Sequence, residues 1–296
     1  MVDMYTKVGI VCCSNGQHIS YKDDIHKLDE ILRNKGIEPV YSDYIYAQNS
    51  VYSGTARERA SALMDFYKDD SLSAIYDISG GDIANEILEY LDYGVNKNNN
   101  KAFWGYSDLT TVINAIYTKT GNPGVLYQMK NLVWDKSKEQ IGRYSDYTEY
   151  AYINKECNDT SLKNMDLFKF NYEFVQGNSM VGVVIGGNVR CFLKLAGTEY
   201  FPDTKDKVLL LESLGGEVPQ MITYLNQLKQ IGVFSKIKGL ILGTFTTMEE
   251  NNHKPNIVEL VKQYVSEDLP IVKTFEIGHG YNSKAIVIGK NICIKS

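Results

Sequence analysis

The run Lys101-Ala102-Phe103-Trp104 leads directly into Gly105-Tyr106-Ser107-Asp108, and a helix-patterned segment over residues 109–119 follows. A short apolar strand that turns sharply into a helix lifts the turn residues out of a sheet, beside the first free N–H groups of that helix. A serine in this place suits a nucleophile, because those groups stabilise an oxyanion. It also suits a helix N-cap, for which serine and aspartate are both favoured. The turn by itself leaves both interpretations open.

Strand and helix patterns alternate along the chain before this turn. Buried strands are predicted at 8–13, 37–41 and 72–78, and helices at 22–35, 56–67 and 83–91. A second tight turn, Ser79-Gly80-Gly81-Asp82, follows the third of these strands. Such alternation predicts a parallel sheet covered on both faces, with ligands bound at the carboxyl ends of its strands. Ser107 and the Gly80-Gly81 turn are both expected at such ends.

The composition changes over residues 136–165, which are rich in Lys, Asp, Glu, Tyr and Asn and lack an apolar period. We interpret this segment as a connector between an N-terminal α/β domain over 1–135 and a C-terminal domain over 166–296. Regular patterns resume after it, with strands predicted at 181–188, 207–211, 237–242, 271–275 and 285–288 and helices at 189–195, 218–231 and 257–265.

Composition and charge exclude several classes of partner. The formal net charge is −5 and no basic block occurs, so a surface that tracks nucleic-acid phosphates is not expected. No apolar run reaches membrane-spanning length and no signal-peptide pattern opens the chain, so we expect no membrane partner. The five cysteines are scattered along the chain, at Cys12, Cys13, Cys157, Cys191 and Cys293. We therefore expect no disulfide framework and a reduced, cytoplasmic location.

Several familiar catalytic motifs are missing from the sequence. There is no Gly-x-Ser-x-Gly, no His-Glu-x-x-His, no P-loop and no Gly-x-Gly-x-x-Gly after a strand. With only four histidines and no His/Cys cluster, no metal site is indicated. We therefore expect neither a metal nor an organic cofactor.

A serine nucleophile needs a general base, and four histidines are available. His18 falls in a polar loop, His26 on the exposed side of the first helix, and His253 in a polar surface loop. His279 differs, because it follows the apolar run 271–275 and stands between two glycines, which permit close backbone approach. Without other support, an ordinary histidine in a glycine turn is the simpler interpretation of this segment.

The imidazole of such a base needs an acid that holds its tautomer. Glu212 is the outstanding candidate, because it ends the apolar run 208–211 and charged residues are rarely buried without a partner. The alternative is that Glu212 has already left the sheet and caps the next turn. Glu217 is better interpreted as the acidic first turn of the following helix.

Several motifs occur in a fixed order and spacing over most of the chain. They are Gly54-Thr55-Ala56-Arg57-Glu58-Arg59-Ala60, Ser79-Gly80-Gly81-Asp82, Leu91-Asp92-Tyr93, Gly105-Tyr106-Ser107-Asp108-Leu109-Thr110, Gly186-Gly187-Asn188, Gly197-Thr198-Glu199-Tyr200-Phe201-Pro202-Asp203 and Leu211-Glu212. In these motifs the sequence resembles the LD-carboxypeptidase family of serine peptidases, which includes the microcin C self-immunity peptidases, and their order and spacing make the resemblance specific.

The resemblance implies a fold and a set of roles. The fold is α/β, with an N-terminal Rossmann-like parallel-sheet domain that carries the serine and a smaller β-rich C-terminal domain that carries the acid and the base. Ser107 would be the nucleophile, Glu212 the residue that orients the base, and His279 the general base. The family also suggests a homodimer.

The resemblance further implies an oxyanion hole formed by the backbone N–H groups of Gly80, Gly81 and Asp108. Two departures from the family pattern bear on the substrate. The family often has an arginine where this chain has Ser79, directly before the glycine turn. The family's histidine segment usually runs on to proline–isoleucine–glycine, whereas residues 286–289 of this chain lack the proline.

Three functions follow as expectations. The first is an LD-carboxypeptidase that releases terminal D-alanine from muropeptides in cell-wall recycling, by acyl transfer to Ser107. The second is a microcin-immunity-like peptidase that cleaves a peptidyl or aminoacyl nucleotide; Trp134 could stack on its base, although a lone tryptophan more often serves packing. The third is a non-enzymatic module that binds a small ligand, with Ser107 as a helix cap.

Overall fold

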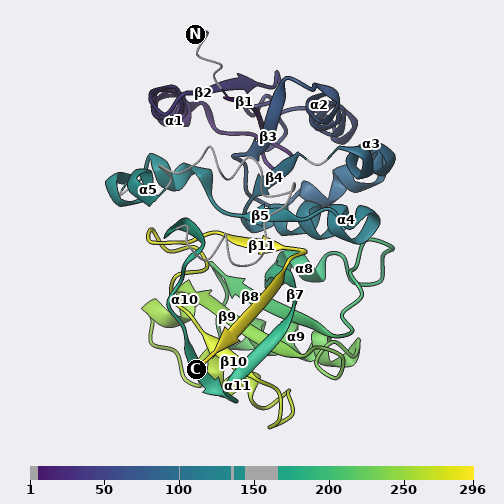
Figure 1. The fold of residues 1–296 in the computed structure, drawn as a ribbon, viewed down its shortest axis with the longest axis vertical. Helices are drawn as coiled ribbons and strands as arrows, with labels where there is room; N and C mark the ends of the chain where they lie inside the picture. Colours follow the sequence, from purple (N-terminus) through teal and green to yellow (C-terminus); the bar gives the residue numbers. More distant parts are fainter. Residues whose placement is uncertain (1–5, 100, 135–136, 144–165) are drawn as a thin grey trace.

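The computed structural model describes residues 6–99, 101–134, 137–143 and 166–296 of the 296-residue chain. Its architecture is two six-stranded sheets, one above the other in Figure 1, with helices around each. The strand order is β11-β5-β4-β3-β1-β2 in the first sheet and β12-β7-β8-β9-β10-β6 in the second. This arrangement confirms the predicted α/β class, with an N-terminal parallel sheet and a second β-rich part.

The first sheet is parallel apart from one edge strand. Its parallel strands are β1 (Thr6–Val11), β2 (Ile37–Tyr41), β3 (Leu72–Asp77), β4 (Ala102–Gly105) and β5 (Gly124–Leu126). The edge strand β11 (Ile286–Ile288) comes from the far end of the chain and pairs antiparallel with β5. The C-terminal part of the chain therefore completes the first sheet, and the expected domain limits at 135 and 166 stay a prediction.

Helices cover both faces of this sheet, as the strand–helix alternation predicts. The helices are α1 (Lys22–Asn34), α2 (Ala56–Lys68), α3 (Tyr93–Asn98), α4 (Thr110–Thr120) and α5 (Ser137–Arg143), and the 3₁₀ segments are η1 (Ile19–Tyr21), η2 (Ala84–Tyr90), η3 (Ser107–Leu109) and η4 (Met129–Leu132). Helix α2 begins with a reciprocal capping box between Thr55 and Glu58. The helix predicted over 83–91 is the 3₁₀ segment η2.

The second sheet has a parallel centre and antiparallel edges. Its parallel strands are β7 (Ser179–Asn188), β8 (Lys207–Ser213), β9 (Gly239–Phe245) and β10 (Ile271–Lys273), and its edges are β12 (Asn291–Lys295) and β6 (Glu173–Gln176). The remaining elements are η6 (Asp166–Phe168), α8 (Val189–Leu193), α9 (Val218–Gln230), α10 (Thr246–Glu250) and α11 (Ile257–Val261). The parallel order brings the carboxyl ends of β7, β8 and β9 to one edge.

Helix α4 joins the two sheets. Its buried Asn114 exchanges two hydrogen bonds with the backbone of Gly186 in β7, one from Nδ2 to the carbonyl at 2.9 Å and one to Oδ1 from the amide at 3.0 Å. One apolar cluster also runs from Val112 on α4 to Val184 and Leu210 in the second sheet. Because this cluster and these bonds are buried, the two sheets pack as one body with a fixed contact between them.

Part of the expected connector, residues 136 and 144–165, lies outside the described residues, and so does Cys157. The four cysteines within the described part, Cys12, Cys13, Cys191 and Cys293, are free thiols. Cys12 and Cys13 are the two residues directly after β1, and burial raises the pKa of both thiols. In the described ranges no helix combines the length and apolarity needed to cross a membrane.

Candidate active site

Ser107 occupies a strained turn between β4 and α4. Its φ is +54°, in the left-handed region that non-glycine residues rarely adopt. The N-cap residues of η3 and α4 are Tyr106 and Leu109, and neither makes a side-chain capping bond. The helix therefore begins without a serine cap, and the Ser107 hydroxyl contacts a histidine instead.

His279 lies between Ser107 and Glu212. Its Nε2 is 3.2 Å from Ser107 Oγ, and its Nδ1 is 2.7 Å from Glu212 Oε2. The His279 backbone N–H donates to Thr244 Oγ1 at 3.1 Å, and the preceding Gly278 has a φ of +139°. A Cβ at Gly278 would overlap Thr244, so glycine is required for this approach. The glycine-flanked histidine that the sequence singled out is thus held by strand β9.

Glu212 is fully buried at the end of β8 and is surrounded by donors. Asn188 Nδ2 donates to its Oε1 at 3.0 Å, from the paired position on β7. The Tyr106 hydroxyl donates to its Oε2 at 3.3 Å. Burial, and then the charge of Glu212, raise the pKa of Tyr106, so the phenol stays protonated and remains a donor. A buried carboxylate with such partners is not left unpaired, and it lies at hydrogen-bond distance from the His279 ring.

The other three histidines lie away from this group. His18 Nδ1 contacts the Ser20 hydroxyl at 2.8 Å in an exposed loop. His26 pairs with Glu30 on the surface of α1, at 3.5 Å. His253 Nε2 is 3.9 Å from a carboxylate oxygen of Glu217 at the start of α9. Of the four histidines in the chain, the structure brings only His279 to Ser107.

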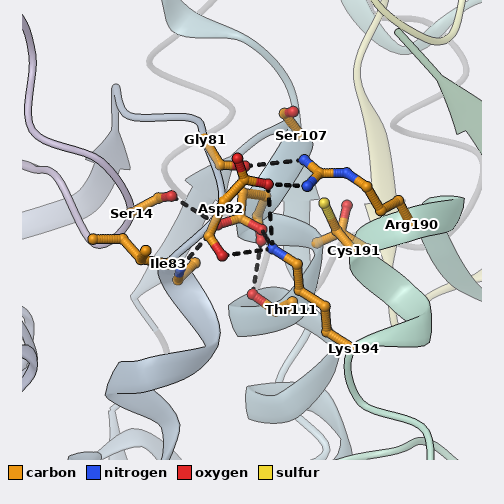
Figure 2. A network of polar contacts seen from close by, with 12 residues as sticks. Ser14, Gly81, Asp82, Ile83, Ser107, Thr111, Arg190, Cys191 and Lys194 are labelled. Atoms are coloured by element: carbon orange, nitrogen blue, oxygen red, sulfur yellow. Dashed lines mark hydrogen bonds and ion pairs between the residues drawn. The ribbon is translucent and has the colours of Figure 1, made fainter. Parts of the chain in front are cut away.

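The Gly80-Gly81 turn lies beside the Ser107 turn. The backbone N–H of Ala84, just after the glycines, donates to Asp108 Oδ2 at 2.8 Å. Gly81 has a φ of +126°, and a Cβ there would overlap the side chain of Asn15. Figure 2 shows Gly81 and Asp82 of this turn in the same close-up view as Ser107. The structure therefore brings the predicted oxyanion residues to the serine's edge of the sheet.

A network of charges around this turn was not found from the sequence. The carboxylate of Asp108 is fully buried and receives Lys194 Nζ on Oδ1 and the Ser14 hydroxyl on Oδ2, the latter at 2.7 Å. Arg190 forms an ion pair with Asp82 (Figure 2). Charged residues on a short helix are usually predicted to face solvent. No local sequence pattern therefore predicts that Arg190 and Lys194 contact Asp82 and Asp108.

The arrangement suits nucleophilic catalysis by acyl transfer. A hydroxyl, an imidazole and a buried carboxylate follow one another at hydrogen-bond distance, which is the geometry of an activated serine. Within the described residues, no group of three or more His, Cys, Asp or Glu side chains is placed to hold a metal ion.

Comparisons with known proteins agree with this architecture. Residues 8–128 match the LD-carboxypeptidase N-terminal domain, and residues 181–294 match the LD-carboxypeptidase C-terminal domain. The microcin C7 self-immunity protein MccF of Escherichia coli is 23% identical over 308 residues, which cover 97% of this chain and 90% of that protein. A probable murein peptide carboxypeptidase of Bacillus subtilis is 26% identical over 272 residues, 90% of this chain and 83% of the relative.

Solved structures share the fold. A structure of MccF in complex with glutamyl sulfamoyl guanosine superposes with a TM-score of 0.82 at 21% identity and covers 99% of this chain and 96% of its own. A muramoyltetrapeptide carboxypeptidase from Oxalobacter formigenes gives a TM-score of 0.77 at 18% identity, covering 98% and 95%.

The two matched domains and the named relatives confirm the expectation of a hydrolase of the carboxypeptidase type. The alternative of a non-enzymatic binding module is therefore wrong. The chain belongs to the LD-carboxypeptidase family.

Proposed function

We propose that this protein hydrolyses an amide bond with Ser107 as nucleophile, His279 as general base and Glu212 as the residue that orients the base. The observation that carries the proposal is the unbroken chain of contacts, 3.2 Å from Ser107 Oγ to His279 Nε2 and 2.7 Å from His279 Nδ1 to Glu212 Oε2. Both distances lie within reach for proton transfer and for orientation of the ring.

In the proposed reaction Ser107 Oγ attacks the substrate carbonyl while His279 Nε2 takes the hydroxyl proton. Glu212 accepts from the Nδ1–H, so the ring keeps Nε2 free as the acceptor. The backbone N–H groups of Gly80, Gly81 and Asp108 are the proposed donors to the oxyanion. His279 then gives its proton to the leaving amine, which leaves an acyl group on Ser107. Water attacks this acyl carbonyl while His279 Nε2 takes its proton, and the proton passes to Ser107 Oγ as the acid product leaves.

The proposed substrate is a muropeptide that ends in D-alanine, cut in the cytoplasm during cell-wall recycling. The similarity to the probable murein peptide carboxypeptidase of Bacillus subtilis, over 90% of this chain, supports this substrate class. A homodimer, which the family resemblance implies, forms part of the proposal. Light scattering on the purified protein tests it, and a mass of one chain of 33.5 kDa would contradict it.

A second candidate function is hydrolysis of a peptidyl or aminoacyl nucleotide. The similarity to MccF over 97% of this chain favours it. Trp134 is 41% exposed, so its indole is available to stack on a base, and Lys130 Nζ lies 5.2 Å from the ring centre. This arrangement supports an aromatic platform with a cation beside it.

One pair of assays separates the two functions. The protein is incubated with a murein tetrapeptide and, separately, with a peptidyl-adenylate analogue, and products are followed by mass spectrometry. We expect release of D-alanine from the tetrapeptide, abolished in Ser107→Ala. Faster cleavage of the adenylate, with a rate that falls in Trp134→Ala, would support the second function. Cleavage of neither compound would contradict both.

A further inference from the structure

The position directly before the glycine turn is occupied by Ser79, which carries no charge. The family often has an arginine at this position, whereas the Ser79 side chain is uncharged and fully buried. Its hydroxyl donates to the carboxylate of Asp77 and accepts the backbone N–H of Ser14 at 3.0 Å. Because these contacts tie Ser79 into the sheet, it has neither the charge nor the reach to bind an anionic substrate group.

Arg190 brings a guanidinium to the same turn from the other sheet. It lies on α8, directly after β7, and extends back to the glycine turn, where its Nη2 donates to the Gly81 carbonyl at 3.1 Å. Its Nη1 forms an ion pair with Asp82. In Figure 2 the guanidinium points toward Gly81 and Asp82.

The neighbouring Lys194 is not equivalent. Its Nζ pairs with the fully buried Asp108 carboxylate and also donates to the Asp82 carbonyl at 2.7 Å, and its side chain is only 18% exposed. A buried carboxylate that loses such a partner is left uncompensated, so the Lys194 charge is committed to holding the fold.

The Arg190 charge, in contrast, is accessible. Its side chain is 43% exposed and that of its partner Asp82 is 62% exposed, and ion pairs between exposed groups contribute little net free energy. A guanidinium carries five N–H donors in a planar fork that matches a carboxylate with two parallel bonds. An incoming carboxylate can therefore share or replace Asp82 at small cost.

We propose that Arg190 binds the terminal carboxylate of the substrate, that of the residue released by hydrolysis. The inference rests on the proposed carboxypeptidase function and specifies how that function selects a free C-terminus. Before substrate arrives, Asp82 and the Gly81 carbonyl hold the guanidinium at the turn. Arg190 thus supplies, from the second sheet, the charge that Ser79 does not provide.

The test compares two substrates that differ only in this charge. One is a murein tetrapeptide with a free terminal D-alanine, and the other is the same peptide with that carboxylate converted to the carboxamide. The value of kcat/KM is measured for each with the wild-type protein and with Arg190→Gln. A matched control is Arg33→Gln, because Arg33 forms a similar exposed pair with Asp29 on α1, at 2.8 Å.

We expect the wild-type protein to prefer the free acid by roughly 10- to 100-fold, the range for one charge-assisted hydrogen-bonded pair. In Arg190→Gln, kcat/KM for the acid falls by about that factor while the value for the carboxamide hardly changes. In Arg33→Gln both values stay at the wild-type level. If Arg190 had a purely structural role, Arg190→Gln would lower kcat/KM for both substrates by the same factor, and the ratio of the two values would stay unchanged.

Two outcomes overturn this inference alone, and a third overturns it together with the proposed function. If Arg190→Gln keeps the wild-type preference for the acid, another group binds the carboxylate, and the proposed serine mechanism still stands. If the wild-type protein cleaves both peptides equally well, no residue selects the charge, and again only this inference fails. If it cleaves neither peptide, the proposed carboxypeptidase function fails first, and the role of Arg190 fails with it.

Discussion

The imidazole Nε2 of His279 lies 3.2 Å from the hydroxyl of Ser107, although the two residues are 172 positions apart in the chain. Ser107 follows β4 of the first sheet, whereas Thr244, which holds the His279 backbone, lies in β9 of the second. The candidate site therefore forms across the contact between the sheets. Variants that alter this contact should change activity as well as stability.

Replacing Ser107 by alanine should remove the nucleophile. We expect kcat toward a murein tetrapeptide to fall by roughly 10³- to 10⁶-fold, since residues of a triad act as a unit. Ser61→Ala is a suitable control, because Ser61 is exposed on α2 and lies outside the site. A Ser107→Ala protein that turns over at the wild-type rate would show that another group attacks the substrate.

The strained backbone of Ser107 leads to a stability prediction. At a φ of +54°, a residue with a Cβ is strained by about 1 kcal/mol relative to glycine. Ser107→Gly should therefore unfold at a higher urea concentration than Ser107→Ala, although both are inactive. Equal midpoints for the two variants would mean that the turn relaxes and stores no strain.

Neutralising Glu212 should disturb the tautomer of His279. In Glu212→Gln we expect kcat to fall by roughly 10³- to 10⁴-fold, because an amide donor facing Nδ1 favours the wrong ring tautomer. Glu199→Gln serves as the control, since Glu199 forms an exposed pair with Lys119 at 2.7 Å. A Glu212→Gln protein within tenfold of wild type would argue against the orienting role.

Removing the Lys194 charge should destabilise the protein. The Asp108 carboxylate is fully buried, so Lys194→Met leaves it uncompensated, and we expect a loss of about 3 kcal/mol in the free energy of unfolding. Lys119→Met, which breaks an exposed pair, should cost less than about 1 kcal/mol. Adding Asp108→Asn to Lys194→Met should restore part of the loss. Urea unfolding measures all three variants.

Alkaline pH should weaken the fold through its buried tyrosines. Burial raises the pKa of Tyr106 and Tyr67 above the ordinary value. The folded state then keeps protons that the unfolded state loses above about pH 10, so stability is full below that pH and falls as pH rises beyond it. Each phenol contributes up to about 1.4 kcal/mol per pH unit.

The Tyr106→Phe variant tests this dependence. It should be less stable near pH 7, because it loses the hydrogen bond to Glu212, yet lose stability less steeply between pH 10 and 12. Urea midpoints across this range give the slope. A slope equal to that of wild type would mean that Tyr106 does not titrate on unfolding.

The pattern of the sequence determined the main elements of the fold. Largely apolar runs such as 72–78 predict buried strands because a parallel sheet covered on both faces needs apolar residues along most of each strand, and β3 confirms this. Short elements were not predicted, among them β5 with three residues and the half-buried edge strand β6 with four. Strands this short carry too few residues to show a period, so only their neighbours define them.

The sequence also predicted the three candidate catalytic residues. Ser107, Glu212 and His279 each follow an apolar run, where parallel strands present their carboxyl ends. The family resemblance then assigned their roles. Local pattern was sufficient here because it records where a strand ends and which side chain stands there.

Only the tertiary structure decided which side chains meet. The donors to Glu212, the buried pair of Asp108 with Lys194 and the reach of Arg190 to Gly81 all join elements far apart in the chain. A periodic pattern reports the burial of a face and nothing about what packs against it. The partners of Arg190 and Lys194 are therefore decided by the packing of α8 against the turns of the first sheet.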